Sequence, residues 1–187
     1  MPMNLPIMLT WLRILFIPLM VLFFYLDAWW APFMTAFTFG IAGLTDWADG
    51  YFARKMQLES RFGAFLDPVA DKLIVAVALL LIVEREGSFW FTLAGTVIIG
   101  REIIISALRE WMAQIGARGS MAVSYIAKVK TTAQIIALIF LLYNQNLFVI
   151  LPIREMGIIA LVIATALTVV SMLQYMQGAF KAVRAMD

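Results

Sequence analysis

Residues 46–71 read DWADGYFARKMQLESRFGAFLDPVAD, and they place four aspartates among mainly apolar sequence. Asp46 and Asp49 are three positions apart, whereas Asp67 and Asp71 are four apart. Side chains at either spacing lie on one face of an α-helix, so each pair is expected to share a face. A short polar break separates the two pairs. The stretch therefore predicts two antiparallel neighbouring helices that bring their carboxylates together.

Apolar sequence surrounds this stretch in both directions. The chain has 187 residues, of which 64% are hydrophobic and 14% are charged, and its mean hydropathy is +0.93. A soluble domain is nearer half apolar and a quarter charged, so water is not the main solvent of this chain. Several apolar stretches are each near the roughly 20 residues that cross a bilayer as a helix. They are 10–26, 31–54, 62–84, 89–113, 122–143 and 150–178.

The basic residues predict how these helices are oriented. With both termini in the cytoplasm, only Arg85 and Arg154 fall near the outer face, and the other basic residues lie toward the inner face. Cytoplasmic loops carry an excess of lysine and arginine, so this arrangement is the expected one. We therefore predict a single all-α membrane domain over residues 1–187, with six transmembrane helices and both termini inside. The first apolar stretch follows no basic region and is expected to be retained as a helix.

Two absent residue types restrict the chemistry of the acidic group. The sequence has no cysteine and no histidine, so a bound metal would have oxygen ligands, and a general base would be a carboxylate or a lysine. Carboxylate oxygens suit Mg²⁺ or Mn²⁺. Carboxylates packed together repel unless cations or protons neutralise them, and ionisable groups inside membrane helices mark functional sites by default. A structural hydrogen-bond network, a proton relay and a cation transporter are the alternatives.

Small residues accompany the acidic pairs. Gly50 and Ala53 lie on or beside the acidic face of the first helix, and Gly63 is one turn before Asp67 on the second. Small residues let helices, or the phosphates of a ligand, approach the backbone closely. Arg54 is one turn beyond Gly50, where it is a candidate contact for a phosphate oxygen or an acidic partner.

In combination, these residues resemble the signature of the CDP-alcohol phosphotransferase family. The defining positions all match with the family's spacing: Asp46, Asp49, Gly50, Ala53, Arg54, Gly63, Asp67 and Asp71. The resemblance covers essentially the whole chain, because residues 101–102, 109–111 and 128–134 are similar to the bacterial branch that uses glycerol 3-phosphate. One departure is Ile7, where the family pattern has threonine, and it removes one possible hydroxyl contact to the nucleotide.

The resemblance implies an enzyme that transfers the phosphatidyl group of CDP-diacylglycerol to sn-glycerol 3-phosphate, giving phosphatidylglycerophosphate and CMP. It implies Mg²⁺ or Mn²⁺, as two ions, with Asp46, Asp49 and Asp67 as ligands. Asp71 is implied both as a ligand near the second metal and as the catalytic base. The residues implied to bind CDP-diacylglycerol are Asn4, Thr10, Asp49, Gly50, Ala53, Arg54, Ser60 and Gly63. Ser60 is equally expected as a turn residue.

The phosphate of such an acceptor requires fixed cations. The candidates are Arg101, Arg109, Arg118, Lys128 and Lys130. Contact with anionic lipid headgroups is the alternative for these residues, and it is as plausible as phosphate binding for Arg118 in a loop. Lys128 and Lys130 point about 200° apart on a helix, so both are not expected to reach one phosphate. Arg101 needs a partner in mid-helix, and Glu102, which is adjacent, is expected to act elsewhere in the site because neighbouring positions do not face each other.

The resemblance also implies a bacterial cytoplasmic (inner) membrane protein whose active site faces the cytoplasm. Membrane lipids and a second copy of the chain, as a homodimer, are the implied partners, and nucleic acid is not expected. Inositol phosphate, serine and choline are alternative acceptors. A metal-ion transporter and a non-catalytic assembly factor are the alternatives outside enzymes.

Overall fold

The structure is a computed structural model, and it describes residues 5–56, 61–116, 125–145 and 151–184. Within some helices it describes the backbone alone, notably at residues 46–56 and 125–128. The helices are α1 (Leu5–Tyr25), α2 (Ala31–Met56), α3 (Arg61–Glu86), α4 (Phe89–Gln114), α5 (Tyr125–Tyr143) and α6 (Ile153–Arg184). Each predicted apolar stretch coincides with one of them, so the all-α prediction is confirmed.

Several of the helices have the length and composition of membrane spans. Among the described residues, three meet both criteria: Met8–Tyr25, Phe89–Gln114 and Ile153–Arg184. Shorter apolar helices run over Ala31–Thr45 and Val129–Tyr143. That all six helices cross a membrane, with both termini inside, stays a prediction.

The outer surface of these helices is rich in large apolar side chains. Leu15 is 63% exposed, Leu44 is 67% exposed and Val162 is 63% exposed. Many exposed large apolar side chains are unfavourable in water, whereas lipid tails accommodate them. The exposed surface thus agrees with the composition in pointing to a lipid environment.

Backbone contacts group the chain into two compact units. Unit 1 comprises Met1–Glu86 and Leu138–Arg154, and unit 2 comprises Gly87–Ala137 and Glu155–Asp187. The divisions at residues 137/138 and 154/155 fall inside α5 and α6, so neither unit is continuous in sequence. The prediction of one domain over the whole chain stays a prediction.

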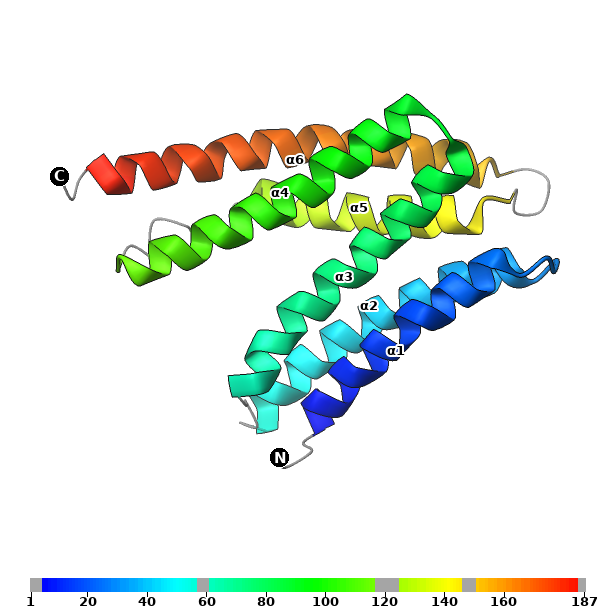
Figure 1. Cartoon of the computed structure of the whole chain (residues 1–187), viewed down its shortest axis with the longest axis horizontal. Coiled ribbons are helices and arrows are strands. Elements are labelled where there is room, and N and C mark those ends of the chain that lie inside the picture. Colours follow the sequence, from blue (N-terminus) through cyan, green and yellow to red (C-terminus); the bar gives the residue numbers. More distant parts are fainter. Residues whose placement is uncertain (1–4, 57–60, 117–124, 146–150, 185–187) are drawn as a thin grey trace. The chain divides into compact units, whose positions relative to one another are not determined.

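In unit 1, α1 is the helix that joins the other two. It packs along α2 and also contacts α3, whereas the described parts of α2 and α3 contact each other less (Figure 1). Small buried residues, among them Ala42, Ala70 and Ala78, are completely inaccessible in these helices. Small side chains let helix backbones approach closely in a membrane protein. The two helices that carry the acidic residues are therefore positioned largely through α1.

The two arginines predicted near the outer face lie close together in unit 1. Arg154 Nη2 is 2.6 Å from Glu86 Oε2, and Arg85 Nε is 3.8 Å from Glu86 Oε1. Glu86 follows the last apolar turn of α3, and Arg154 is in the first turn of α6. The structure therefore places both cations at one end of unit 1. That this end faces the outer side of a membrane stays a prediction.

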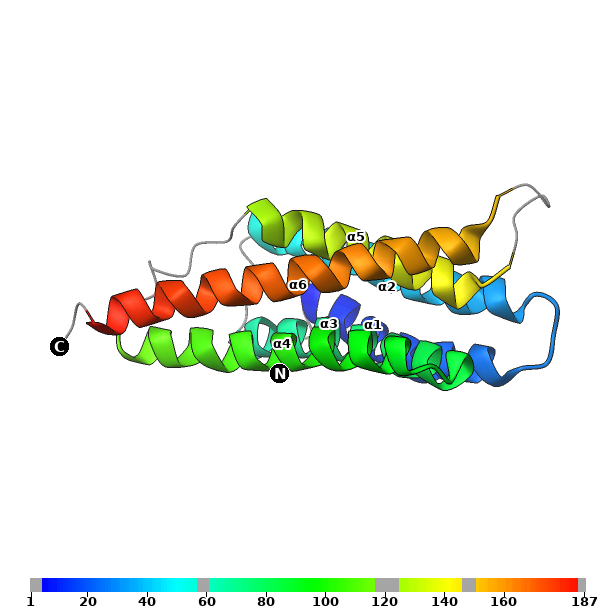
Figure 2. The ribbon, with the colours of Figure 1, turned by 90° about the horizontal axis from the view of Figure 1, so that it is seen from above.

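In unit 2, α4 and α6 run alongside each other in both views (Figures 1 and 2). Ile105 and Met112 of α4 form a buried core with Tyr175 and Ala179 of α6. The side chain of Ile105 is 2% exposed, whereas that of Ile103 on the same helix is 63% exposed. Packing of α4 on α6 thus depends on one face of α4.

We predict that Ile105→Ala destabilises the protein by roughly 2 kcal/mol, because it removes buried van der Waals contacts without letting the helices collapse fully. Thermal unfolding of purified protein in detergent measures the change. Ile103→Ala is the matched control and should leave the unfolding temperature nearly unchanged. Equal effects of the two substitutions would contradict the assigned face of α4.

Candidate functional site

Two side chains of α1 bind the two aspartates of α3. Thr10 Oγ1 donates a hydrogen bond to Asp67 Oδ1, and Arg13 Nη1 donates one to Asp71 Oδ1 at 2.5 Å. Thr10 is fully buried and the Arg13 side chain is 1% exposed, whereas the Asp71 side chain is 42% exposed. Asp71 is therefore held from its buried side while part of the residue remains accessible.

For the other acidic pair, Asp46 and Asp49, the structure describes the backbone alone. Asp46, Asp49, Gly50, Ala53 and Arg54 all lie in the second half of α2. Their side chains are not among those described, so convergence of the two acidic pairs stays a prediction. Among the side chains that the structure does describe, no three acidic groups come together.

The remaining residues implied to bind the donor have mixed outcomes. Thr10 is buried against Asp67, as just described, and Gly63 is buried on α3 one turn before Asp67. Asn4 and Ser60 lie outside the described residues. Arg13 was not among the implied site residues, although the resemblance includes it with Thr10 in the family's N-terminal segment near the nucleotide. The structure adds its contact with Asp71.

In unit 2, Glu102 of α4 is the centre of a charged network. Lys130 Nζ of α5 is 2.6 Å from Glu102 Oε1, and Arg101 Nη1 is 3.1 Å from the same oxygen. The Lys130 side chain is 2% exposed and the Arg101 side chain is 8% exposed. Cations this deeply buried require a counter-charge, because desolvation of an unpaired ion costs several kcal/mol. Glu102 supplies that charge to both.

The contact between Arg101 and Glu102 corrects the expectation that these adjacent residues do not meet. Their Cβ atoms leave the helix in different directions, but both side chains are long enough to bend toward Lys130. They meet beyond the surface of α4, where Lys130 Nζ lies. Spacing along a helix constrains where a side chain starts, and the partner on the neighbouring helix determines where it ends.

Tyr175 of α6 contacts both arginines of α4, a role that the sequence analysis did not predict. Arg109 Nη2 donates a hydrogen bond to Tyr175 Oη at 2.9 Å. The guanidinium carbons of Arg109 and Arg101 are 5.0 and 5.5 Å from the centre of the Tyr175 ring. Arg101 Nη2 also lies 3.5 Å from Ser171 Oγ, one turn earlier on α6. The polar groups of Ser171 and Tyr175, four residues apart on an apolar helix, were the only signal in the sequence.

The structure thus brings Arg101, Arg109 and Lys130 into one group around Glu102 and Tyr175. The cations in this group outnumber its one carboxylate, so the group suits an anion such as a phosphate. Lys128 lies on α5, with its side chain outside the description, and Arg118 lies outside the described residues altogether. Whether those two residues join the group stays a prediction.

The profile of the CDP-alcohol phosphatidyltransferases matches residues 3–173 of the chain. The chain belongs to the CDP-alcohol phosphatidyltransferase family. Similar curated proteins include the CDP-diacylglycerol–glycerol-3-phosphate 3-phosphatidyltransferases of Shigella flexneri serotype 5b (strain 8401) and Escherichia coli (strain K12). Each is 52% identical over 176 residues, which are 94% of this chain and 94% of the relative.

The match to the CDP-alcohol phosphatidyltransferases includes both acidic pairs and most of the charged network. Glu102 and Lys130 lie well inside the matched residues, whereas Tyr175 lies two positions beyond their end at 173. The matched range therefore covers the contacts of α1 with α3 as well as Glu102 and Lys130. Tyr175 is supported by its contacts alone.

We predict that Glu102→Leu lowers stability by about 2 kcal/mol, because it leaves Arg101 and Lys130 buried beside each other without their counter-charge. Thermal unfolding in detergent measures the loss. The double substitution Glu102→Leu with Lys130→Met should recover part of it, since one unpaired cation is removed. Glu155→Gln, which changes an exposed carboxylate of α6, is the control, and a loss as large in this variant would contradict the role assigned to Glu102.

Proposed function

We propose that the protein transfers the phosphatidyl group of CDP-diacylglycerol to sn-glycerol 3-phosphate, forming phosphatidylglycerophosphate and CMP. The observation that carries the proposal is the 52% identity, over 94% of the chain, to relatives named for this reaction. The acidic residues held by α1 and the cationic group of unit 2 support it. The protein is then a transferase of phospholipid biosynthesis.

In the proposed reaction, a hydroxyl oxygen of glycerol 3-phosphate attacks the phosphorus that carries the diacylglycerol. The bond from that phosphorus to the bridging oxygen of the diphosphate breaks, and CMP leaves with that oxygen. The attacking hydroxyl loses its proton to a carboxylate, for which Asp71 is the candidate. Arg13 orients Asp71 through the contact at 2.5 Å, while the 42% exposure of the Asp71 side chain gives the acceptor access. Correct orientation of such a base accounts for a large part of its effect.

The carboxylate oxygens of the two acidic pairs suit a hard divalent cation. The carboxylates available to hold two ions of Mg²⁺ or Mn²⁺ are Asp46, Asp49, Asp67 and Asp71. Thr10 binds one oxygen of Asp67, and a carboxylate has further lone pairs with which to coordinate a metal. Bound ions would neutralise charge on the donor's diphosphate and on the departing CMP. Asp71 is a candidate for both ligand and base.

Two glycines, one on α2 and one on α3, support a nucleotide site beside the acidic pairs. We assign the CDP end of the donor to Asn4, Thr10, Asp49, Gly50, Ala53, Arg54, Ser60 and Gly63. Gly50 and Gly63 lack side chains, and this lets a ligand approach the helix closely. Arg54 would neutralise a phosphate oxygen.

For the acceptor, we assign the phosphate to Arg101, Arg109 and Lys130, with Arg118 and Lys128 as further candidates. The described cations are already oriented by Glu102 and Tyr175, so binding the phosphate requires little loss of side-chain freedom. Glycerol 3-phosphate carries such a phosphate and free serine does not, so the group favours a phosphorylated acceptor.

We further propose that the six helices span the bacterial inner membrane, with both termini and the active site on the cytoplasmic side. The apolar helices and the exposed apolar side chains support this arrangement. The diacyl chains of the substrates then remain in the bilayer. A homodimer is the proposed assembly.

The first test is CMP release by the purified protein in detergent with CDP-diacylglycerol, Mg²⁺ and glycerol 3-phosphate. We expect turnover to require the metal. It should fall roughly 100-fold or more in Asp71→Asn, because the amide that replaces the carboxylate cannot accept the proton. Glu155→Gln is the matched control and should keep full activity. Turnover with serine or inositol phosphate, but not with glycerol 3-phosphate, would be consistent with the family but would refute glycerol 3-phosphate as the acceptor.

The second test concerns Tyr175. Tyr175→Phe removes the hydrogen bond to Arg109 and keeps the ring, so we expect the KM for glycerol 3-phosphate to rise roughly fivefold. The KM for CDP-diacylglycerol should not change. Tyr25→Phe removes an exposed hydroxyl in unit 1 and is the control. An equal rise of both KM values in Tyr175→Phe would refute a role specific to the acceptor.

A further inference from the structure

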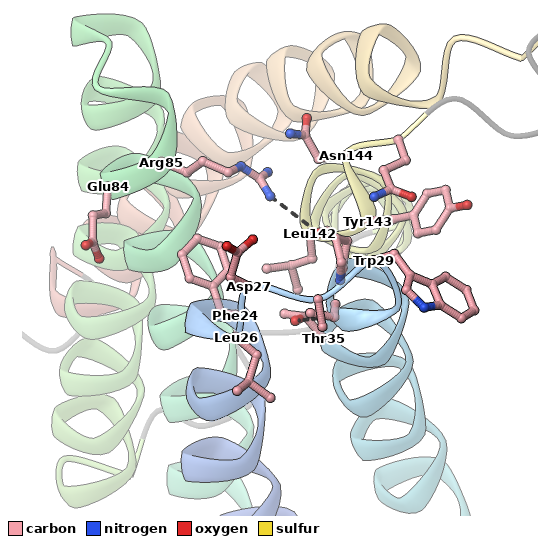
Figure 3. A pocket seen from close by; sticks show the side chains of 14 residues that line it. Phe24, Leu26, Asp27, Trp29, Thr35, Glu84, Arg85, Leu142, Tyr143 and Asn144 are labelled. Atoms are coloured by element: carbon pink, nitrogen blue, oxygen red, sulfur yellow. Dashed lines mark hydrogen bonds between the residues drawn. The ribbon is translucent and has the colours of Figure 1, made fainter.

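Unit 1 contains a cavity of about 570 Å³ where α1 and α3 end and α2 begins (Figure 3). The turn between α1 and α2 and the ends of α3 and α5 line it. From Asp71 to Glu84, which lines the cavity, α3 rises by about 20 Å at 1.5 Å per residue. The cavity is therefore separate from the acidic residues assigned to catalysis.

Arg85 is the cation of this cavity, and it is held in place by the end of α5. Its guanidinium donates hydrogen bonds to the carbonyl oxygens of Leu141 and Leu142, the latter at 3.4 Å, and lies 5.6 Å from the centre of the Phe24 ring. The last carbonyls of a helix carry partial negative charge, so they stabilise this cation. The Arg85 Nε also lies 3.8 Å from Glu86 Oε1. A guanidinium has five N–H donors, so these contacts still leave donors for another acceptor.

Asp27 is the carboxylate available to a ligand in this cavity. It is exposed in the turn between α1 and α2, and among the described residues it has no hydrogen bond or ion pair. Glu84, the other acidic residue of the lining, accepts a hydrogen bond from Tyr25. Figure 3 shows that Asp27 and Arg85 both project toward the middle of the lining residues. The cavity thus offers one cationic and one anionic group.

The size and surroundings of the cavity favour an amphiphile over a single ion. Its volume is many times the roughly 30 Å³ of one water molecule, so a polyatomic group fits. Trp29 lines the cavity and is 87% exposed, and Trp30 beside it is 37% exposed. Tryptophan rings in such positions are typical of the headgroup region of a bilayer. A ligand arriving from that region has its charged groups at the cavity and its tails among lipids.

We propose that this cavity binds the headgroup of a zwitterionic phospholipid that carries a primary ammonium, with Asp27 holding the ammonium and Arg85 the phosphate. An ammonium with N–H donors can form a charge-assisted hydrogen bond to a carboxylate, and a trimethylated one cannot. A headgroup without an amine leaves Asp27 without a counter-charge. The site is independent of the proposed transfer reaction.

The test uses the full chain, purified in detergent and titrated with dioleoyl lipids while native mass spectrometry counts bound lipid. We expect phosphatidylethanolamine to reach half-saturation at roughly fivefold lower concentration than phosphatidylcholine or phosphatidylglycerol, as expected for one partly exposed charge-assisted hydrogen bond. Free phosphoethanolamine, which lacks tails, should bind far more weakly. Equal binding of the three lipids, or equally tight binding of free phosphoethanolamine, would overturn the proposal.

Variants of Asp27 locate the effect. Asp27→Asn preserves shape and should abolish the preference for phosphatidylethanolamine, whereas Asp27→Glu should retain most of it. Glu155→Gln, which removes a carboxylate outside the cavity lining, should retain it fully. CMP release by Asp27→Asn should be unchanged, which shows that the variant is folded. A preference that survives in Asp27→Asn would refute the site.

Discussion

A guanidinium that is 1% exposed inside a helix bundle must have a carboxylate beside it, and Arg13 has Asp71. Removing the carboxylate would leave a buried charge, whereas removing both partners would cost less, so the pair fixes the position of α1 against α3. The hydrogen bond between Thr10 and Asp67 repeats the constraint one turn away. Because α1 also packs along α2, the placement of both acidic helices follows from these contacts.

The charged network of unit 2 obeys the same rule in a different way. Arg101, Arg109 and Lys130 would repel one another if no anion were near. Glu102 reduces that repulsion for Arg101 and Lys130, and Tyr175 presents its ring and hydroxyl to the arginines. Glu102 also competes with any anionic ligand for the same donors, so an anion that binds there must offset the contacts that Glu102 loses.

The helices were predictable because a bilayer imposes a length of apolar sequence that few other features share. The acidic positions of α3 were predictable because their spacing and the family signature agree. Tyr175 and the contact between Arg101 and Glu102 were not, since they depend on which helix lies opposite, and periodicity identifies only a face. Lys130 shows the limit well: its candidacy came from family resemblance, whereas its burial and its pairing with Glu102 required the structure.

The contact of Arg85 with the end of α5 has a consequence for how the chain is made. Leu142 follows Arg85 by 57 residues, so at 5–20 residues per second it leaves the ribosome roughly 3–11 s later. During that interval the guanidinium at the end of α3 has neither of its carbonyl partners, and the neighbouring Glu86 and water are left to stabilise it. The contacts of α3 with α1 can form before that time, whereas the contact of Arg85 with α5 forms only after α5 has been synthesised.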